Sequence, residues 1–153
     1  MPTLGSAHDE IAAALAPGMF SRALLDDSNQ PVAWIAVSKS WGRVWEIQPL
    51  IVAVAHQRRG YGRQLVDAVE RHVAFQGGLT MWVGTSDTTG ATSVSGADLY
   101  QDPFTSLATI AALRPHPFRF WQSVGYRIVG VVPDAEGPGQ PSICLAKRVG
   151  GPG

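Results

Sequence analysis

Residues 44–63 read VWEIQPLIVAVAHQRRGYGR, and this stretch decides the fold. It begins with β-branched and aromatic residues, which favour a strand over 44–54. It ends in a turn with glycines at positions 60 and 62. An amphipathic helix pattern follows, with the apolar positions Leu65, Val66, Val69 and Val73. A second strand-like run covers residues 79–84, so the order is that of a βαβ unit with two parallel strands.

Proline at position 49 interrupts the first strand of this unit. Proline has no N–H group to donate to a sheet ladder, so it is found at a sheet edge or at a bulge. A bulge here would hold backbone groups open for a ligand. The alternative is a pair of short strands on either side of Pro49.

The remaining segments complete the fold prediction. Further strands are expected over 20–25, 32–38, 126–132 and 142–147, and short helices over 8–16, 104–113 and 118–124. The Gly- and Pro-rich residues 133–141 are expected to form a loop. The 153 residues suit a single domain. Residues 1–7 and 150–153 are expected to be poorly ordered.

Composition excludes several classes of protein. Lys plus Arg and Asp plus Glu each number 12, and this zero net charge argues against nucleic-acid binding through a basic surface. One cysteine, Cys144, excludes an internal disulfide, and no ligand cluster predicts a metal. No apolar run approaches the roughly 18 residues of a membrane span. Without a basic signal region at the N-terminus, we expect a cytoplasmic protein.

The turn Gln57–Gly62 has the composition of an anion-binding site. A helix N-terminus offers unpaired N–H groups and a partial positive charge. The two glycines allow a pyrophosphate to approach the backbone closely. Positive charge is added by Arg58, Arg59 and Arg63. The alternative is an ordinary turn with solvated arginines, but the βαβ context favours binding. The segment lacks the Gly-Lys-Ser/Thr of a Walker loop and the first glycine of a Rossmann motif.

On these residues the sequence resembles the GCN5-related N-acetyltransferases (GNAT), in which a Q/R-x-x-G-x-G/A segment cradles the pyrophosphate of acetyl-coenzyme A. Residues 120–126, FWQSVGY, look like the second signature of that superfamily. Residues 45–52, WEIQPLIV, are similar to the acceptor strand of its aminoglycoside 6'-N-acetyltransferase branch. Other segments similar to that branch are 98–100, 113–118, 129–135 and 146–149, and together the likeness covers about residues 20–149.

The resemblance implies an α/β (α+β) GNAT fold: a mixed, mostly antiparallel central sheet with a splayed, bulged strand and flanking helices. It also implies that the chain begins after the family's N-terminal strand and helix. Part of the acceptor wall would then be missing or supplied by a partner subunit. We expect a homodimer.

The resemblance implies acetyl-coenzyme A as co-substrate. Its expected contacts are Ile51, Val52, Ala53, Gln57, Arg58, Arg59, Gly60, Tyr61, Gly62, Arg63 and Trp121. Trp121 stands where the superfamily usually has a tyrosine near the thioester sulfur. An indole N–H donates a hydrogen bond but is no acid at neutral pH.

The acceptor amine, with a pKa near about 10, must lose a proton before it can attack. The resemblance assigns to Glu46 the roles of orienting the ammonium and taking its proton, and to the Leu50 N–H the role of oxyanion donor. Gln48 shares the face of Glu46 and is a further substrate residue. The alternative for Glu46 is an exposed position on an antiparallel pair.

Residues 84–113 contain acidic residues and no Lys or Arg. Asp87 and Asp98 are therefore candidate contacts for a cationic substrate. Turn formation and helix capping are an equally good explanation of these acids and of Asp102.

Three functions fit the sequence. The first is an aminoglycoside 6'-N-acetyltransferase acting by direct transfer in a ternary complex. The second is an acetyltransferase for another cationic amine, such as a polyamine or a peptide. The third is an acetyl-coenzyme A-binding module that has lost catalysis.

Overall fold

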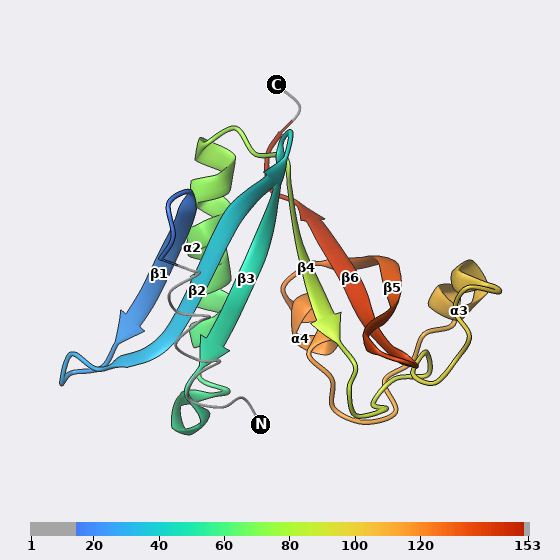
Figure 1. Cartoon of the computed structure of the whole chain (residues 1–153). Coiled ribbons are helices and arrows are strands. Elements are labelled where there is room, and N and C mark those ends of the chain that lie inside the picture. Colours follow the sequence, from blue (N-terminus) through green and yellow to red (C-terminus); the bar gives the residue numbers. More distant parts are fainter. Residues whose placement is uncertain (1–14, 152–153) are drawn as a thin grey trace. The chain divides into compact units, whose positions relative to one another are not determined.

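The computed structural model describes residues 15–151, and residue contacts divide the chain into two compact units. The first unit contains β1 (Met19–Leu25), β2 (Pro31–Trp41), β3 (Val44–Val52), the 3-10 helix η1 (Val54–His56) and α2 (Tyr61–Phe75) (Figure 1). The second contains most of β4 (Thr80–Ser86), with α3 (Pro103–Ala108), α4 (Phe118–Ser123), β5 (Arg127–Gly137) and β6 (Gln140–Arg148). The helix expected over 8–16 lies almost entirely outside the described residues.

The first unit is an antiparallel sheet of β1, β2 and β3 with α2 packed on one face (Figure 1). The apolar stripe predicted for the helix is the packed face. Its fully buried members are Leu65, Val66, Val69 and Val73, and they meet buried residues of the sheet such as Ile35, Val37 and Ile47. Burial of this stripe holds the helix, and hence the turn that precedes it, against the sheet.

The bulge predicted at Pro49 is confirmed. Ala36 of β2 lies opposite both Gln48 and Pro49 of β3, so the ladder between the strands is interrupted there. The Gln48–Pro49 peptide is cis. β3 nevertheless continues as one strand through Val52, so the alternative of two short strands is wrong.

In the second unit the strand order is β4-β6-β5, and β5 and β6 form an antiparallel hairpin. The prediction of a loop over 133–141 is wrong, because β5 continues to Gly137 and β6 begins at Gln140. Asp134 adopts a left-handed conformation with φ of 52°, and its Oδ1 accepts a 2.7 Å hydrogen bond from the Gly139 N–H. This bond closes an irregular hairpin in a segment whose composition alone suggests a loop.

The helix expected over 104–113 is shorter than predicted. α3 ends at Ala108, and Ala112 instead forms an isolated bridge with Thr92. The other expected strands and the helix over 118–124 all form, with ends shifted by a few residues. Within residues 15–151 no helix has both the length and the apolar character needed to cross a membrane.

Candidate functional site

The turn before α2 holds two residues with positive φ. Arg58 has φ of 64° and Gly60, the N-cap of the helix, has φ of 86°. The first helical hydrogen bond runs from the Gln64 N–H to the Gly60 oxygen at 3.0 Å. The N–H groups of the three residues between them, 61–63, therefore have no partner within the helix.

The start of α2 itself carries no negative charge. The first turn of α2 contains no acidic residue, and no side chain caps it. The side chains of Arg58 and Arg59 are exposed. A Cβ built on Gly60 would meet no atom within 4 Å, so the backbone there is open to close approach. Backbone N–H groups at the start of a helix, positive charge and an exposed turn suit a pyrophosphate, and so the turn fits the expected co-substrate.

The segment that leads into the turn is tied to the sheet. The Ala53 N–H donates to the Val32 oxygen at 2.9 Å, which continues the pairing of β3 with β2. Ile51 is exposed and Val52 is half-buried. The Gln57 side chain donates through Nε2 to the Val52 oxygen at 3.1 Å, so it points back toward β3.

Glu46 lies half-buried on β3, opposite Ser38 of β2. Its neighbour Trp45 makes an edge contact with His72 of α2, at 6.1 Å between ring centroids. Because side chains alternate along a strand, Glu46 and Gln48 project from the sheet face that α2 does not cover. Among the described residues no side chain or backbone group hydrogen-bonds to the Glu46 carboxylate. Leu50 follows the bulge and pairs in register with Ile35.

Asp87 has a different environment from the one predicted. It is 1 % exposed, and its carboxylate accepts hydrogen bonds from the N–H groups of Ala91 and Thr92, both at 2.8 Å, and from the Thr92 hydroxyl at 2.7 Å. Burial pushes the pKa of Asp87 upward, but these hydrogen bonds outweigh it and the pKa is lowered. These contacts fit the turn-forming explanation, the second of the two roles that the sequence leaves open for Asp87.

Asp98 and Asp102 are exposed and also act locally. The Asp98 carboxylate accepts hydrogen bonds from the Tyr100 N–H at 3.3 Å and the Gln101 side chain at 2.9 Å. Asp102 caps α3 by accepting from the Thr105 N–H at 3.1 Å. Hydrogen bonds from the side chain and backbone of Thr105 lower the pKa of Asp102. Turn formation and capping describe both residues.

Trp121 is buried in α4. Its ring packs edge-on against Phe120 and Tyr126, each at 5.1 Å between centroids. Tyr126 is itself 2 % exposed. These contacts make the indole part of an aromatic cluster in the second unit.

Two side chains of the second unit, Arg114 and His116, hold neighbouring segments together by hydrogen bonds, and the sequence did not predict the role of Arg114. The Arg114 guanidinium donates to the carbonyl oxygens of Thr89 and Gly90 and clamps the loop that Asp87 organises. Arg114 could have been found as the first cation after the long stretch without Lys or Arg. His116 accepts the Phe118 N–H at Nδ1 and lies 3.2 Å from the Ser86 oxygen at Nε2, so it joins the start of α4 to the end of β4.

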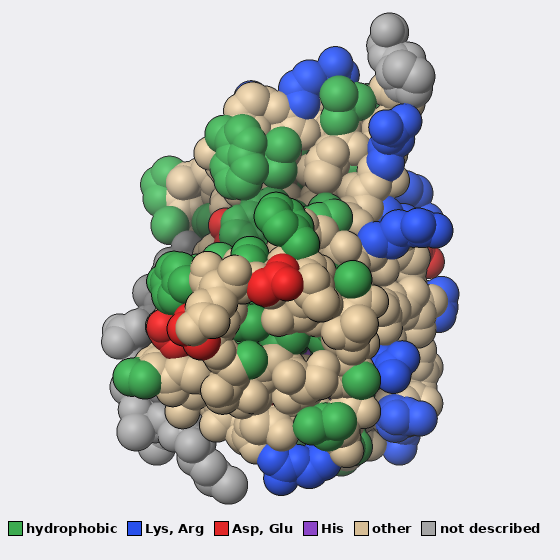
Figure 2. Space-filling model, turned by 90° about the vertical axis from the view of Figure 1, so that its right-hand side faces the viewer, with side chains coloured by type: hydrophobic (Ala, Val, Ile, Leu, Met, Phe, Trp, Pro, Cys, Tyr) green, Lys and Arg blue, Asp and Glu red, His purple; other side chains and the backbone are tan. Residues whose placement is uncertain are grey.

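Within the second unit, large apolar side chains remain on the surface. Figure 2 shows hydrophobic side chains over this face with acidic side chains between them. The exposed apolar residues of the unit include Tyr100, Phe104, Leu113, Val129 and Val132.

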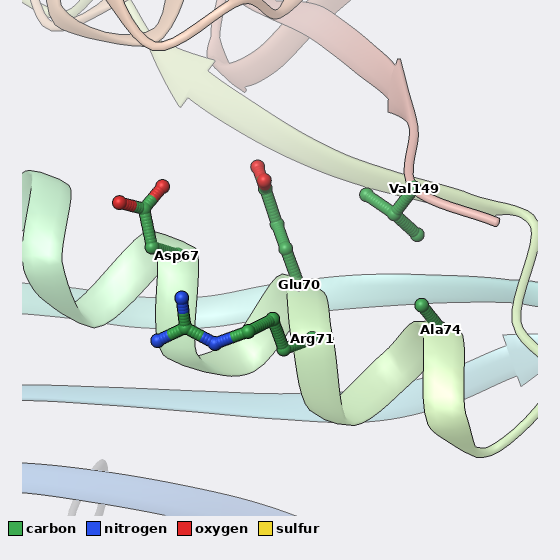
Figure 3. Close-up of a pocket in the computed structure, with 5 residues that line it drawn as sticks. All are labelled: Asp67, Glu70, Arg71, Ala74 and Val149. Carbon is green, nitrogen blue, oxygen red and sulfur yellow. The ribbon is translucent and has the colours of Figure 1, made fainter.

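A pocket of about 220 Å³ lies along α2 in the first unit and is lined by Asp67, Glu70, Arg71, Ala74 and Val149 (Figure 3). None of these residues belongs to the predicted site. The predicted residues Glu46, Gln48, Leu50, 51–53 and 57–63 all belong to the first unit, and Asp87, Asp98 and Trp121 to the second.

The sequence model of the acetyltransferase (GNAT) family matches residues 5–101, and the chain belongs to this family. The predicted resemblance and GNAT fold are confirmed. The chain is 35 % identical to an aminoglycoside 6'-N-acetyltransferase solved with coenzyme A, with a TM-score of 0.88 over 96 % of this chain and 81 % of that one. The aminoglycoside 6'-N-acetyltransferase from Enterococcus faecium gives 35 % identity and a TM-score of 0.88 over 95 % and 82 % of the two chains.

A more distant structure extends the likeness. An aminoglycoside 6'-acetyltransferase type Ii is 28 % identical, with a TM-score of 0.69 over 94 % of this chain and 77 % of its own. Among curated proteins none matches the sequence significantly.

Proposed function

We propose that this protein is an aminoglycoside 6'-N-acetyltransferase, which transfers the acetyl group of acetyl-coenzyme A to a primary amine of an aminoglycoside. The observation that carries the proposal is the 35 % identity, over nearly the whole chain, to two solved enzymes of that description. The open, uncompensated helix end in the turn 57–63 supports the co-substrate.

The turn would hold the pyrophosphate of acetyl-coenzyme A. The N–H groups of residues 61–63 donate to its oxygens, and Arg58, Arg59 and Arg63 add positive charge. Ile51, Val52 and Ala53 carry the backbone that leads from the acceptor strand to this turn.

The acceptor chemistry is assigned to β3. Glu46, with no partner among the described residues, holds the ammonium and takes its proton. The neutral nitrogen attacks the thioester carbonyl carbon to form a tetrahedral intermediate, and the carbon–sulfur bond then breaks. Coenzyme A leaves as its thiolate, and the second proton lost from the nitrogen neutralises this thiolate, which gives the amide and the free thiol. The Leu50 N–H, next to the bulge, stabilises the oxyanion of the tetrahedral intermediate. A thiol pKa of about 8.5 allows the thiolate to leave without an acid in the place of Trp121.

The direct test is a thiol-release assay with acetyl-coenzyme A across a panel of amines. We expect turnover with kanamycin-like aminoglycosides and little with analogues that carry a hydroxyl in place of the 6'-amine. NMR of the product locates the acetyl group. If every aminoglycoside is ignored and a polyamine or a simple monoamine is acetylated, the second function replaces the first. The cytoplasmic location and the homodimer remain predictions, and light scattering tests the dimer.

Glu46→Gln tests the acceptor chemistry because it keeps the shape and removes the charge. We expect kcat/KM to fall by about 10²–10⁴-fold, with partial recovery at higher pH, where more amine is already neutral. The affinity for coenzyme A should hardly change. Glu70→Gln is the matched control, because it removes another carboxylate of the first unit, one that lies on α2. Wild-type activity of Glu46→Gln on aminoglycosides would refute the assignment.

A further inference from the structure

Two side-chain contacts flank the turn: one ties its first residue back to the end of β3, and the other crosses the turn to the start of α2. The Gln57 Nε2 donates to the Val52 oxygen at 3.1 Å, which closes the segment before the turn. The His56 ring stacks on the ring of Tyr61, the first residue of α2, at 6.1 Å between centroids and 29° between planes. One contact fixes where the turn leaves the sheet, and the other fixes where the helix begins.

The turn needs these contacts because the core does not hold it. Residues 57–60 are all exposed, and η1 contains no buried residue. Arg58 adopts a left-handed conformation that costs free energy in a residue other than glycine. A segment with few buried contacts and an unfavourable backbone angle is free to open unless something local holds it.

The His56 ring contributes by stacking on Tyr61 and not by a hydrogen bond of its Nδ1. Its Nδ1 is buried and has no hydrogen-bond partner in the described part of the chain. A buried nitrogen without a partner destabilises the fold, so hydrogen bonding does not explain the position of this ring. A phenyl ring would stack on Tyr61 without that cost.

We propose that His56 and Gln57 are positioning residues for coenzyme A binding. They hold the turn so that the N–H groups of residues 61–63 converge on the pyrophosphate, and neither side chain touches the ligand. Preorganisation of this kind lowers the ordering cost of binding. The inference rests on the proposed function, and it specifies how Gln57, an expected cofactor-binding residue, would act.

The test is isothermal titration of coenzyme A, which needs no turnover, on His56→Ala, His56→Phe and Gln57→Ala. We expect His56→Ala and Gln57→Ala to bind about tenfold more weakly, a change of about 1.4 kcal/mol. His56→Phe should stay within about twofold of the wild type, because it keeps the stacking. KM for acetyl-coenzyme A should rise in the two alanine variants while kcat stays unchanged. Gln76→Ala, an exposed glutamine at the other end of α2, is the control.

Three outcomes overturn the inference in distinguishable ways. Wild-type affinity in both alanine variants would show that the turn holds itself. Equal losses in His56→Phe and His56→Ala would show that an imidazole nitrogen acts on the ligand. If the wild-type protein binds no coenzyme A, the proposed function fails together with this inference. Should His56→Ala fail to fold, Gln57→Ala and His56→Phe still decide the question.

Discussion

The turn 57–63 of the first unit and the loop 87–92 of the second both gather backbone N–H groups, but they treat them differently. In the loop, three N–H groups and a hydroxyl converge on Asp87, whose carboxylate is buried. In the turn, the first helical turn of α2 contains no acidic residue, and the side chain of its N-cap residue supplies no cap. The chain supplies the anion in one region and leaves it to be supplied in the other.

This difference separates a structural site from a binding site. Clustered N–H groups attract negative charge wherever they occur. When a side chain of the same chain provides that charge, the site is complete and stabilises the fold. When none does, the donors are available to an external anion. Asp87 makes turn-forming hydrogen bonds within its own loop, and the turn without an acid in the first turn of its helix is the better candidate for a ligand.

The largest expected effect is on stability in the loop. Asp87→Ala leaves buried N–H groups of residues 91 and 92 without a partner, and we expect a loss of about 3 kcal/mol or more in the free energy of unfolding. Asp98→Ala, an exposed acid with two local hydrogen bonds, should cost less than about 1 kcal/mol. Urea denaturation measures both. Equal stability of the two variants would contradict the structural role of Asp87.

The next effect is on binding in the turn. Gly60→Glu gives the turn a carboxylate of its own, as Asp87 does for the loop. We expect coenzyme A to bind at least about 100-fold more weakly, or about 2.7 kcal/mol, and its thermal stabilisation to disappear. The left-handed backbone makes any side chain here cost about 1–2 kcal/mol of stability.

Gly60→Ala is the matched control because it carries the same backbone cost without the charge. It should keep most of the affinity, since nothing in the chain lies within 4 Å of the added carbon. Comparable loss of binding in both variants would mean that backbone conformation, not anion recognition, governs this turn.

Local patterns predicted most of the first unit. The 3.6-residue periodicity located α2, and the missing N–H of Pro49 located the bulge, because both depend on neighbours in sequence. The glycines at 60 and 62 marked the turn. The sequence left two roles open for Asp87, because its hydrogen-bond partners are fixed by the path of the loop. The hairpin over 133–141 was missed because the bond from Gly139 to Asp134 outweighs a loop-like composition. The His56 stacking on Tyr61 depends on the turn itself.

A smaller effect is expected at Trp121, whose ring is buried in an aromatic cluster of the second unit. Trp121→Phe keeps an aromatic ring beside Tyr126 and removes the indole N–H. We expect turnover to change by less than about tenfold, or roughly 1.4 kcal/mol, because the thiolate leaves without an acid. A fall of several orders of magnitude in a folded variant would give the indole a chemical role.

The smallest effect distinguishes the two units by their response to pH. Burial of His72 in the first unit, with the nearby Arg22 charge, lowers its pKa below 6.5. A lowered folded-state pKa gives stability that is present above the unfolded value and is lost as pH falls through the folded one. The hydrogen bonds that lower the pKa of Asp87 mean that the second unit also loses stability as the pH falls below 3.8.

The loss of stability toward acid pH should therefore have two separate contributions, one from His72 and one from Asp87. His72→Phe retains stacking on Phe20, which the imidazole makes at 3.4 Å between centroids, and should remove only the component just below pH 6.5. Asp87→Asn should remove only the component below pH 3.8. Unfolding midpoints in urea from pH 8 down to pH 3 measure both. If the stability of His72→Phe falls with pH below 6.5 as steeply as that of the wild type, His72 is not the group whose protonation destabilises the first unit. If Asp87→Asn retains the slope below 3.8, the carboxylate does not hold its loop as an anion, and the contrast with the turn loses its physical basis.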